Sequence, residues 1–253
     1  MTISVSGIIF GLLLLLAPLY ILYVFSDKLV SKFIVATAKM LVYTGILSAV
    51  IYFVFLMDNV LVSILASLLM AVMAAMATVV KSRLKVSQFI VPACAGIVAT
   101  TIFYALYFLF LVLGVKSPFN AHFFLPVCGM FVGMMLEINY KALSTYYVGL
   151  EHHHQLYDYL IGNGATHAEA VRYFAGKAIE KAAISGISKM AYMVFGTTPV
   201  ILWSMLLAGS DVITASLLQI LFLIAGFSAT MVSIVVTLFV AKRYAFDAYD
   251  SLV

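Results

Sequence analysis

Long stretches without a charged residue dominate the chain. Asp, Glu, Lys and Arg are absent from seven of them: residues 1–26, 40–57, 59–80, 86–115, 117–136, 190–210 and 212–241. Each approaches or exceeds the roughly 20 apolar residues that a helix needs to cross a bilayer. Runs such as GIIFGLLLLLAPLY do not alternate polar and apolar positions, which argues against a membrane β-barrel. The pattern predicts an all-α integral membrane protein with about seven transmembrane helices.

Composition supports this prediction. The chain is 65% hydrophobic and 9% charged, with a mean hydropathy of +1.17, which leaves too little polar surface for a water-soluble globule. Residues 1–253 are predicted to form a single transmembrane domain. Cys94 and Cys128 lie in apolar spans, so we expect them to pack as small side chains. The net charge of +4 requires no nucleic-acid partner, because the basic residues face anionic lipids of the bilayer.

The distribution of basic residues predicts the orientation. Cytoplasmic loops of membrane proteins collect Lys and Arg. With seven spans and the N-terminus outside, only Lys116 falls in an outer loop, and Lys39 and Lys189 lie within snorkelling reach of the inner interface. We therefore predict a multi-pass protein of the cell (inner or plasma) membrane with a cytoplasmic C-terminus. The inner flanks and loops receive Lys28, Lys32, Lys81, Arg83, Lys85, Lys141, Arg172, Lys177, Lys181, Lys242 and Arg243.

Small residues and prolines mark special points in the predicted helices. Small side chains recur at every fourth position of residues 60–80 and predict close helix packing, within one subunit or at a dimer seam. Gly129 and Gly133 form a GxxxG pair. Pro92 predicts a bend near the start of residues 87–114, and Gly196 with Pro199 predicts a break or hinge in the sixth crossing. The recurring small residues are Ser63, Ser67, Ala71 and Ala75.

One polar window, residues 151–181, interrupts the apolar pattern. It contains four of the five histidines and must be cytoplasmic by the charge distribution. Gly162-Asn163-Gly164 predicts a division into two helical pieces. Thr166 with Glu169 fits a capping box at the start of a short helix outside the membrane. The small side chains of this helix's first turns suit insertion into a groove on a partner protein; they are Ala165, Ala168 and Ala170.

A few side chains are candidates for metal or cation chemistry. Glu137 is an acid inside an apolar helix; it either pairs with Lys141 one turn on or helps to pass a cation. Met130, Met134 and Met135 offer soft sulfur ligands, although packing is the simpler interpretation. His152, His153 and His154 are consecutive and cannot converge on one ion in a helix. Only Glu151, His154 and Asp158 share a face there, and a solvated polar turn is the favoured interpretation.

The absence of several sequence motifs argues against some classes of function. The sequence contains no G-x-x-x-x-G-K-[ST] phosphate loop, so P-loop binding of ATP is not expected in this chain. Paired acids, a Ser/His pair and HExxH-like spacing are also absent, so we expect no catalytic residue and no bound cofactor. A transporter that works without an ATPase would need ionisable residues deep inside several helices, and the sequence has almost none.

The Gly164-Ala165-Thr166 turn, with Asp158 six positions earlier and a helix after it, resembles the EAA-type coupling segment of ABC transporter permeases. The last 125 or so residues resemble the FetB-like permeases, described as iron exporters with plant relatives linked to aluminium tolerance. The chain departs from that family at residues 133–136 and 199–204. The matching features are LPVCGMFVG (125–133), GATHAEA (164–170), Ile179 with Ala182 opening the next helix, Pro199, Ala208-Gly209 and Gln219.

The resemblance implies a transport subunit. It implies two copies of the permease with two copies of a cytoplasmic ABC ATPase, which binds ATP and Mg²⁺ in place of this chain. The implied cargo is a metal ion, with iron favoured. A permease for a non-metal substrate and a transporter or channel without an ATPase stay open as alternatives. The implied ATPase-coupling residues are Asp158, Gly164, Ala165, Thr166, Glu169 and Ala170.

Overall fold

The computed structural model describes residues 5–192 and 199–245, and these are helical with no strand among them. The chain falls into two compact units, Met1–Met57 and Asp58–Val253, and each is described by itself. The all-α prediction is thereby confirmed for the described residues. The prediction of a single domain stays a prediction.

The first unit contains α1 (Val5–Leu13), α2 (Leu16–Phe25) and α3 (Asp27–Met57). The sequence predicted one span over residues 1–26, yet the structure divides its helix at Leu14 and Leu15. Pro18 explains this break, because it has no amide hydrogen to donate to the carbonyl of Leu14 and its ring crowds that carbonyl. Residues Ile9–Phe25 form a shorter apolar helical segment, which is not among the helices long enough to cross a membrane.

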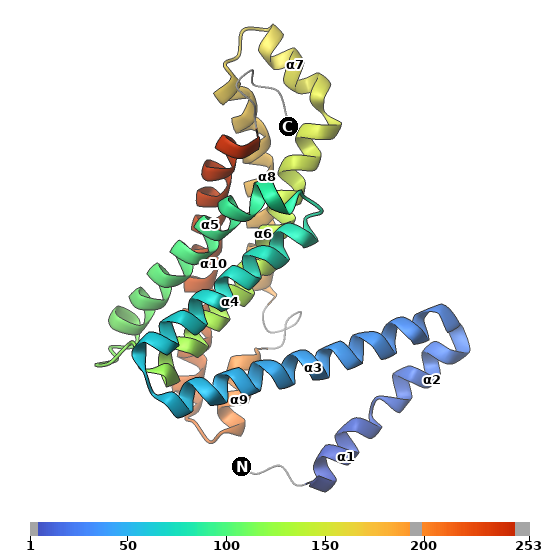
Figure 1. The fold of residues 1–253 in the computed structure, drawn as a ribbon, viewed down its shortest axis with the longest axis vertical. Coiled ribbons are helices and arrows are strands. Elements are labelled where there is room, and N and C mark those ends of the chain that lie inside the picture. The colour runs from blue at the N-terminus through green and yellow to red at the C-terminus, as the bar shows by residue number, and fades with distance from the viewer. Residues whose placement is uncertain (1–4, 193–198, 246–253) are drawn as a thin grey trace. The chain divides into compact units, whose positions relative to one another are not determined.

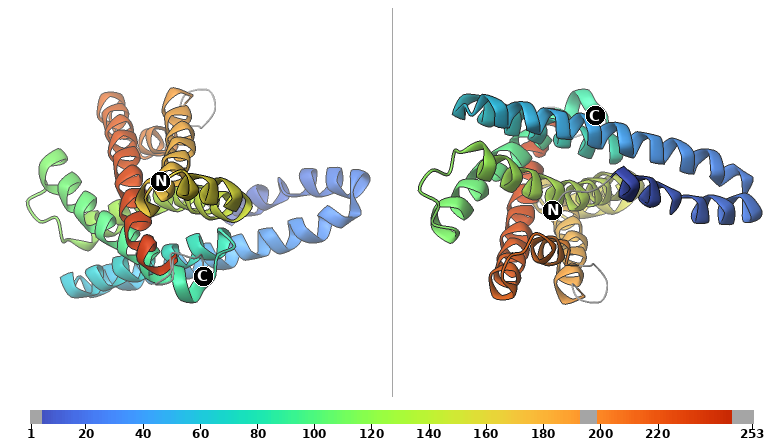
Figure 2. Two further views of the ribbon diagram at one scale, coloured as in Figure 1. Left: turned by 90° about the horizontal axis from the view of Figure 1, so that it is seen from above. Right: turned by 90° about the horizontal axis from the view of Figure 1, so that it is seen from below.

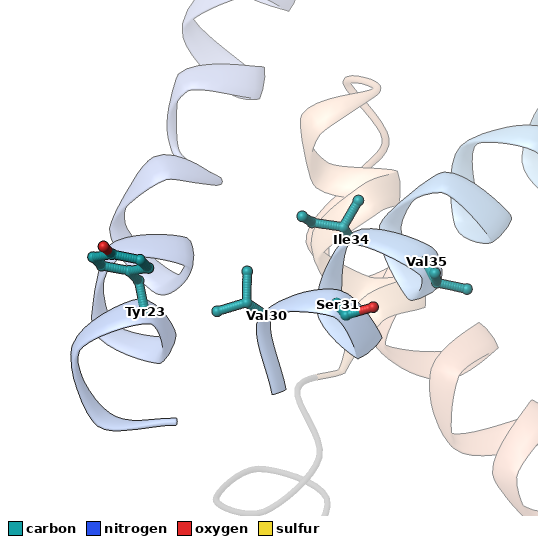
Figure 3. Close-up of a pocket in the computed structure, with 5 residues that line it drawn as sticks. All are labelled: Tyr23, Val30, Ser31, Ile34 and Val35. Carbon is teal, nitrogen blue, oxygen red and sulfur yellow. The ribbon is translucent and has the colours of Figure 1, made fainter. Parts of the chain in front are cut away.

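An open hollow of about 380 Å³ lies between α2 and α3 (Figure 3). Tyr23 of α2 lines it, together with Val30, Ser31, Ile34 and Val35 of α3. Two hydroxyl groups are its only polar side-chain groups, so this hollow offers no cluster of chemically active residues. We therefore look for function in the second unit.

The second unit is a helical bundle built around one long helix, α6 (Figure 1). Helices α4, α5, α8 and α10 all pack against α6, and α5 also packs along α10. Its elements are α4 (Val60–Lys81), α5 (Val86–Tyr107), the π-helix η1 (Phe108–Val112), α6 (Ala121–His152), α7 (His154–Gly162), α8 (His167–Ala191), α9 (Val200–Leu207) and α10 (Val212–Ala245).

Five helices are long and apolar enough to cross a membrane: Lys28–Met57, Val60–Lys81, Val86–Val112, Ala121–Leu150 and Val212–Ala241. They match five of the seven predicted spans. The span predicted over 190–210 is divided between the end of α8 and the short helix α9. Residues 193–198, with the predicted hinge residue Gly196, lie outside the described residues. The protein is thus a multi-pass helical membrane protein, and the count of seven crossings stays a prediction.

The small residues of α4 pack against other helices of the same subunit. Ser63, Ser67, Ala71 and Ala75 are all buried, and α4 packs against α5 and α6. Within the described residues the structure therefore favours packing in one subunit over a dimer seam. Helix α5 is continuous through Pro92, and α6 is continuous through Pro126.

Glycines allow the closest helix approaches, in a seam formed by α5, α6, α8 and α10. At Gly96 of α5, an added methyl group would overlap the hydroxyl of Thr237 and lie 2.8 Å from the carbonyl oxygen of Ser233 on α10. Gly226 of α10 receives the side chain of Met134 from α6. Gly186 of α8 meets the ring of Phe227 on α10. Such contacts let backbones approach closely where the hydrophobic effect does not drive helices together.

Contacts along α6 fix the relative direction of its neighbours. Gly129 lies against Met70, and the Ser82 hydroxyl donates to the carbonyl of Tyr140 at 3.1 Å, so α4 and α6 run in the same direction. Gly149 lies against Phe174 while Ile138 lies near Gly186, so α8 runs in the opposite direction. Figure 2 shows these helices of the second unit from above and from below.

Candidate coupling site

The polar window forms the end of a helical hairpin. Helix α6 continues past Tyr140, where α4 ends beside it, to His152, which is a further rise of about 18 Å. The short helix α7 turns the chain, and α8 returns alongside α6. Figure 1 shows α7 and the adjoining ends of α6 and α8 extending past the turn between α4 and α5. The hairpin therefore reaches beyond the level at which α4 ends.

The α7–α8 turn, residues 163–166, has the geometry of a Schellman motif. Gly164 adopts φ +89°, a left-handed conformation that glycine adopts without strain. The amide of Gly164 donates to the carbonyl of Ile161 at 3.0 Å, and the amide of Ala165 donates to that of Leu160 at 3.0 Å. The side chain of Asn163 also donates to the carbonyl of Tyr159 at 2.7 Å. The predicted division of the window at these residues is confirmed.

The start of α8 is a complete capping box, as the sequence predicted. The Thr166 hydroxyl oxygen accepts from the amide of Glu169 at 3.4 Å, and a Glu169 carboxylate oxygen accepts from the Thr166 amide at 2.8 Å. The Thr166 amide and the Thr166 hydroxyl both donate to this carboxylate, which favours its charged form and lowers the pKa of Glu169 below its usual 4.5. The turn is therefore locally fixed although it is exposed.

The helix after the turn is much longer than predicted. The sequence predicted a short helix followed by another that opens at Ile179 and Ala182, whereas α8 is one helix of 25 residues. Its alanines explain the difference. Ala170, Ala178 and Ala182 are fully buried, and their small size lets α8 pack against α6 along its length. Tertiary contact thus continues a helix that its polar sequence alone would not have stabilised.

The predicted coupling residues divide into two groups in the structure. Gly164, Thr166 and Glu169 are exposed, and Ala165 is half-buried at the same turn. Asp158 is exposed on α7. Ala170 instead faces the interior and belongs to a buried cluster with Val171, Phe174 and other apolar side chains. The surface available to a partner is therefore the turn itself together with α7, while Ala170 anchors α8 to the bundle.

The intramembrane candidates Glu137, Met130 and Met134 all lie on α6. Glu137 forms ion pairs with Lys141, at 3.5 Å, and with Lys189 at the end of α8. The pairing with Lys141 was predicted, and the partner on α8 was not. Met134 packs on Gly226, which supports its role as a packing residue, while Met130 is 39% exposed. Cys94 and Cys128 are free thiols, in agreement with their predicted packing role.

No group of three or more His, Cys, Asp or Glu side chains suited to a metal ion occurs among the described residues.

Pro199 precedes α9 as its N-cap residue and is buried. The side chain of Gln219 on α10 accepts from the amide of Leu202 at 3.2 Å and joins α9 to α10. The sequence identified Gln219 only through the resemblance, whereas Pro199 was also predicted as a break in the sixth crossing.

Two polar contacts in the membrane-spanning part could not be found from the sequence. The Asn139 side chain donates to the Ser233 hydroxyl at 2.8 Å, and the hydroxyls of Tyr104 and Ser228 lie 2.7 Å apart. Each pair joins helices about a hundred residues apart in sequence. A polar residue in an apolar run predicts a hydrogen-bond partner on another helix, but the sequence does not show which residue that partner is.

The comparisons with known proteins were made with the whole chain. No curated protein and no solved structure matched it. One family model, described as "Uncharacterised protein family (UPF0014)", matched residues 5–246. The match covers all of the described helices, including the polar window at residues 151–181 and the span that precedes it. The chain therefore belongs to the UPF0014 family of ABC-transporter permease-like membrane proteins.

Proposed function

We propose that this chain is the membrane-spanning subunit of an ABC transporter, powered by a separate cytoplasmic ATPase. Two permease chains would assemble with two ATPase chains, in the cell membrane, with seven crossings and the N-terminus outside. The favoured cargo is a metal ion moved outward, with iron supported by the resemblance to FetB-like permeases. The alternatives, a non-metal cargo or transport without an ATPase, are separated from this proposal by the experiments below.

The observation that carries the proposal is the α7–α8 turn. It combines an exposed position at the end of a hairpin with a backbone that two hydrogen-bond motifs hold in place. Such motifs are common at helix ends, and here they preorder an exposed surface, which loses less conformational entropy when it binds another protein.

Helix α8 gives the turn a mechanical connection to the membrane. Its 25 residues measure about 37 Å, and its buried alanines pack it on α6. Movement of the turn would therefore shift α8 and α6 together. Helix α8 ends at Ala191, shortly before the predicted hinge at Gly196 and Pro199. ATP binding and hydrolysis in the partner would bias two arrangements of these helices, as alternating access requires.

The first test is co-purification of an ATP-binding partner from the native host with the full chain. Gly164→Trp places a large side chain on the turn, and we expect at least tenfold loss of the co-purified ATPase and of its activity. Gly164→Ala imposes the same φ strain without the bulk and should retain binding. Gly176→Trp is a matched control for bulk, because Gly176 is exposed on α8 with open space around it.

Equal recovery of the ATPase with all three variants would exclude the turn as the docking site. Cargo is tested separately, by measuring metals in cells with and without the gene. We expect cellular iron to rise when the gene is absent. Unchanged iron and unchanged levels of other metals would remove metal export and leave the non-metal alternative.

A further inference from the structure

A groove of about 490 Å³ lies between α4 and α5 in the second unit. Leu68 and Val72 of α4 line one side of it, and the small residues Cys94, Ala95 and Ala99 are among those that line it on α5. All of its lining side chains are apolar, if the thiol is counted as a small hydrophobic group. Both helices are long and apolar enough to cross a membrane, so the groove is suited to an apolar occupant.

The groove and the turn beside it together match the thickness of one leaflet. The α4–α5 turn, residues 82–85, joins two helices that pack side by side. Along α5, Ile90 and Ala99 are the first and last residues that line the groove, and they follow Lys85 at rises of about 8 and 21 Å. One leaflet with its headgroups is about 20–22 Å thick. A lipid with its headgroup at the turn would therefore place an acyl chain along the groove.

The α4–α5 turn is basic. Arg83 and Lys85 are exposed there, and neither pairs with an acid within the part of the chain that the structure describes. Lys81, the third basic residue, lies over the ring of Tyr140 on α6, 4.1 Å from its centre. Residues 59–136 contain no Asp or Glu. The cationic groups of Arg83 and Lys85 are therefore available to an anion from outside the chain.

Arg83 occupies a backbone position that favours glycine. Its amide donates to the carbonyl of Val80 at 3.1 Å, and the amide of Leu84 donates to that of Val79 at 3.4 Å. These bonds form a Schellman motif in which Arg83, with φ +59°, holds the position of Gly164 in the α7–α8 turn. A side chain in this left-handed conformation costs free energy that glycine avoids. In return the turn carries a guanidinium group, whose planar fork suits phosphate.

The first turn of α5 adds to the positive potential beside the groove. Lys85 is the N-cap residue of α5, and its side chain makes no capping hydrogen bond. The amides and the dipole at a helix N-terminus attract an anion. This end of the groove therefore combines two cationic side chains with the positive end of a helix.

Charge separates the possible occupants of the groove. A second copy that pairs through this face would bring its own Arg83 and Lys85 to the same depth, and like charges repel. The first half of α3 carries three lysines and one acid, so its net charge is also positive. An anionic phospholipid instead supplies apolar chains for the groove and a phosphate for the basic turn. Because lipid tails are as apolar as leucine, the preference for this lipid comes from the headgroup.

We propose that the groove between α4 and α5 is a binding site for an anionic phospholipid. One acyl chain lies in the groove, and Arg83, Lys85 and the first amides of α5 bind the phosphate. A zwitterionic lipid with the same chains fits the groove, but its ammonium group cancels the attraction to the turn. The site is independent of the transport function and of the α7–α8 turn, so its test can fail while the docking experiment succeeds, and the reverse.

Quenching of tryptophan fluorescence by brominated acyl chains measures which lipid occupies the groove. The chain has a single tryptophan, so in a Trp203→Phe background one new tryptophan reports on one place. Val91→Trp is at an exposed position of the groove, and Leu68→Trp on the opposite wall is a second reporter. The full chain is reconstituted in vesicles of phosphatidylcholine and phosphatidylglycerol with identical chains, of which one lipid is brominated. We expect phosphatidylglycerol to compete at least about fourfold better at both reporters.

Met73→Trp is the matched control position. Met73 is exposed on α4 and follows Val72 directly, so it lies at the same depth but about 100° further around the helix. We expect the two lipids to compete about equally there. An equal preference at Met73→Trp and at the groove would show a general attraction to the basic surface and would overturn the proposal.

Two other results would also overturn the proposal. If neither lipid quenches Val91→Trp or Leu68→Trp, then α3 or a second copy covers the groove and a lipid site is excluded. If both lipids quench these reporters equally, the groove is in contact with bulk lipid and selects no headgroup.

Substitutions at the turn test the headgroup contacts. Arg83→Gly and Lys85→Gln should each lower the preference for phosphatidylglycerol at Val91→Trp by about two- to fivefold. Arg83→Gly also removes the backbone strain, so the midpoint of thermal unfolding in detergent should stay the same or rise, which separates loss of the ligand from loss of the fold. Lys177→Gln is the control for an equal change of charge, because Lys177 pairs with Glu180 on α8. An unchanged preference in both Arg83→Gly and Lys85→Gln would contradict phosphate binding at the turn.

Discussion

The α7–α8 turn and the seam between α5 and α10 both depend on glycine, for opposite physical reasons. Gly164 is needed for its backbone, because φ is +89° there while the space around it is open. Gly96 is needed for its missing side chain, because Thr237 and Ser233 occupy the space that a methyl group would fill. The turn thus has room for an added side chain but restricts the backbone, and the seam has no such room.

The hydrogen bonds of the turn and of the seam also differ, in the sequence separation of the residues that they join. Every bond that holds the turn joins residues no more than five apart, such as Ala165 with Leu160. The bonds between the membrane helices join Asn139 with Ser233 and Tyr104 with Ser228. The turn can therefore form by itself, whereas the seam forms only when the helices assemble. We expect substitutions at the turn to alter partner binding and those at the seam to alter folding.

The largest expected effect is at Gly96. Gly96→Ala places a methyl group 2.8 Å from the backbone oxygen of Ser233, and backbone in a packed helix cannot move aside cheaply. Overpacking of this kind costs about 1–3 kcal/mol. The measurement is the midpoint of thermal unfolding of the full chain in detergent. Gly176→Ala is the control, since Gly176 lies in the same type of structure with open space, and it should be neutral or stabilising.

If Gly96→Ala and Gly176→Ala unfold at the same temperature, α5 and α10 do not approach as closely as described. The contrast between seam and turn would then be lost.

A smaller effect is expected at the Asn139–Ser233 hydrogen bond. A double-mutant cycle with Asn139→Ala and Ser233→Ala should give a coupling energy of about 0.6 kcal/mol, and up to about 1.7 kcal/mol, as for other buried bonds between membrane helices. The readout is again unfolding in detergent. Asn139 and Thr214 are not hydrogen-bonded to each other, so the effects of Asn139→Ala and Thr214→Ala on the free energy of unfolding should be additive. A coupling energy as large in that pair would show that the cycle reports a general loss of stability and not the hydrogen bond.

The smallest effect is expected at the capping box, and it depends on pH. The pKa of Glu169 is lowered in the folded protein, so its contribution is present above its ordinary value of 4.5 and is lost as the pH falls through the lower folded value. Amide exchange in the first turn of α8, corrected for intrinsic rates, should therefore accelerate in that acidic range. Glu169→Gln should remove most of this pH dependence, while Glu180→Gln, about three turns further along α8, should keep it. An unchanged acid response in Glu169→Gln would assign it to another group.

Much of the fold followed from the apolar runs alone. Five of the predicted spans correspond to helices long enough to cross a bilayer, and the capping box was predicted from Thr166 and Glu169. Both are local signals: the length of an apolar run and the spacing of two side chains on one turn. The break at Leu14 also has a local signal in Pro18, although the surrounding run is uniformly apolar and by itself predicts one continuous helix.

The length of α8 and the surroundings of Glu137 could not be predicted. Helix α8 is polar enough to suggest a short surface helix, and its continuation depends on alanines that pack against α6. Glu137 was expected to pair with Lys141, but its pairing with Lys189 depends on α8 running antiparallel to α6. The sequence by itself determined where helices form and where they are capped, because those energies come from neighbours along the chain. Only the tertiary structure decided which helices pack against α6 and which charges meet on it, because those contacts join residues far apart in sequence.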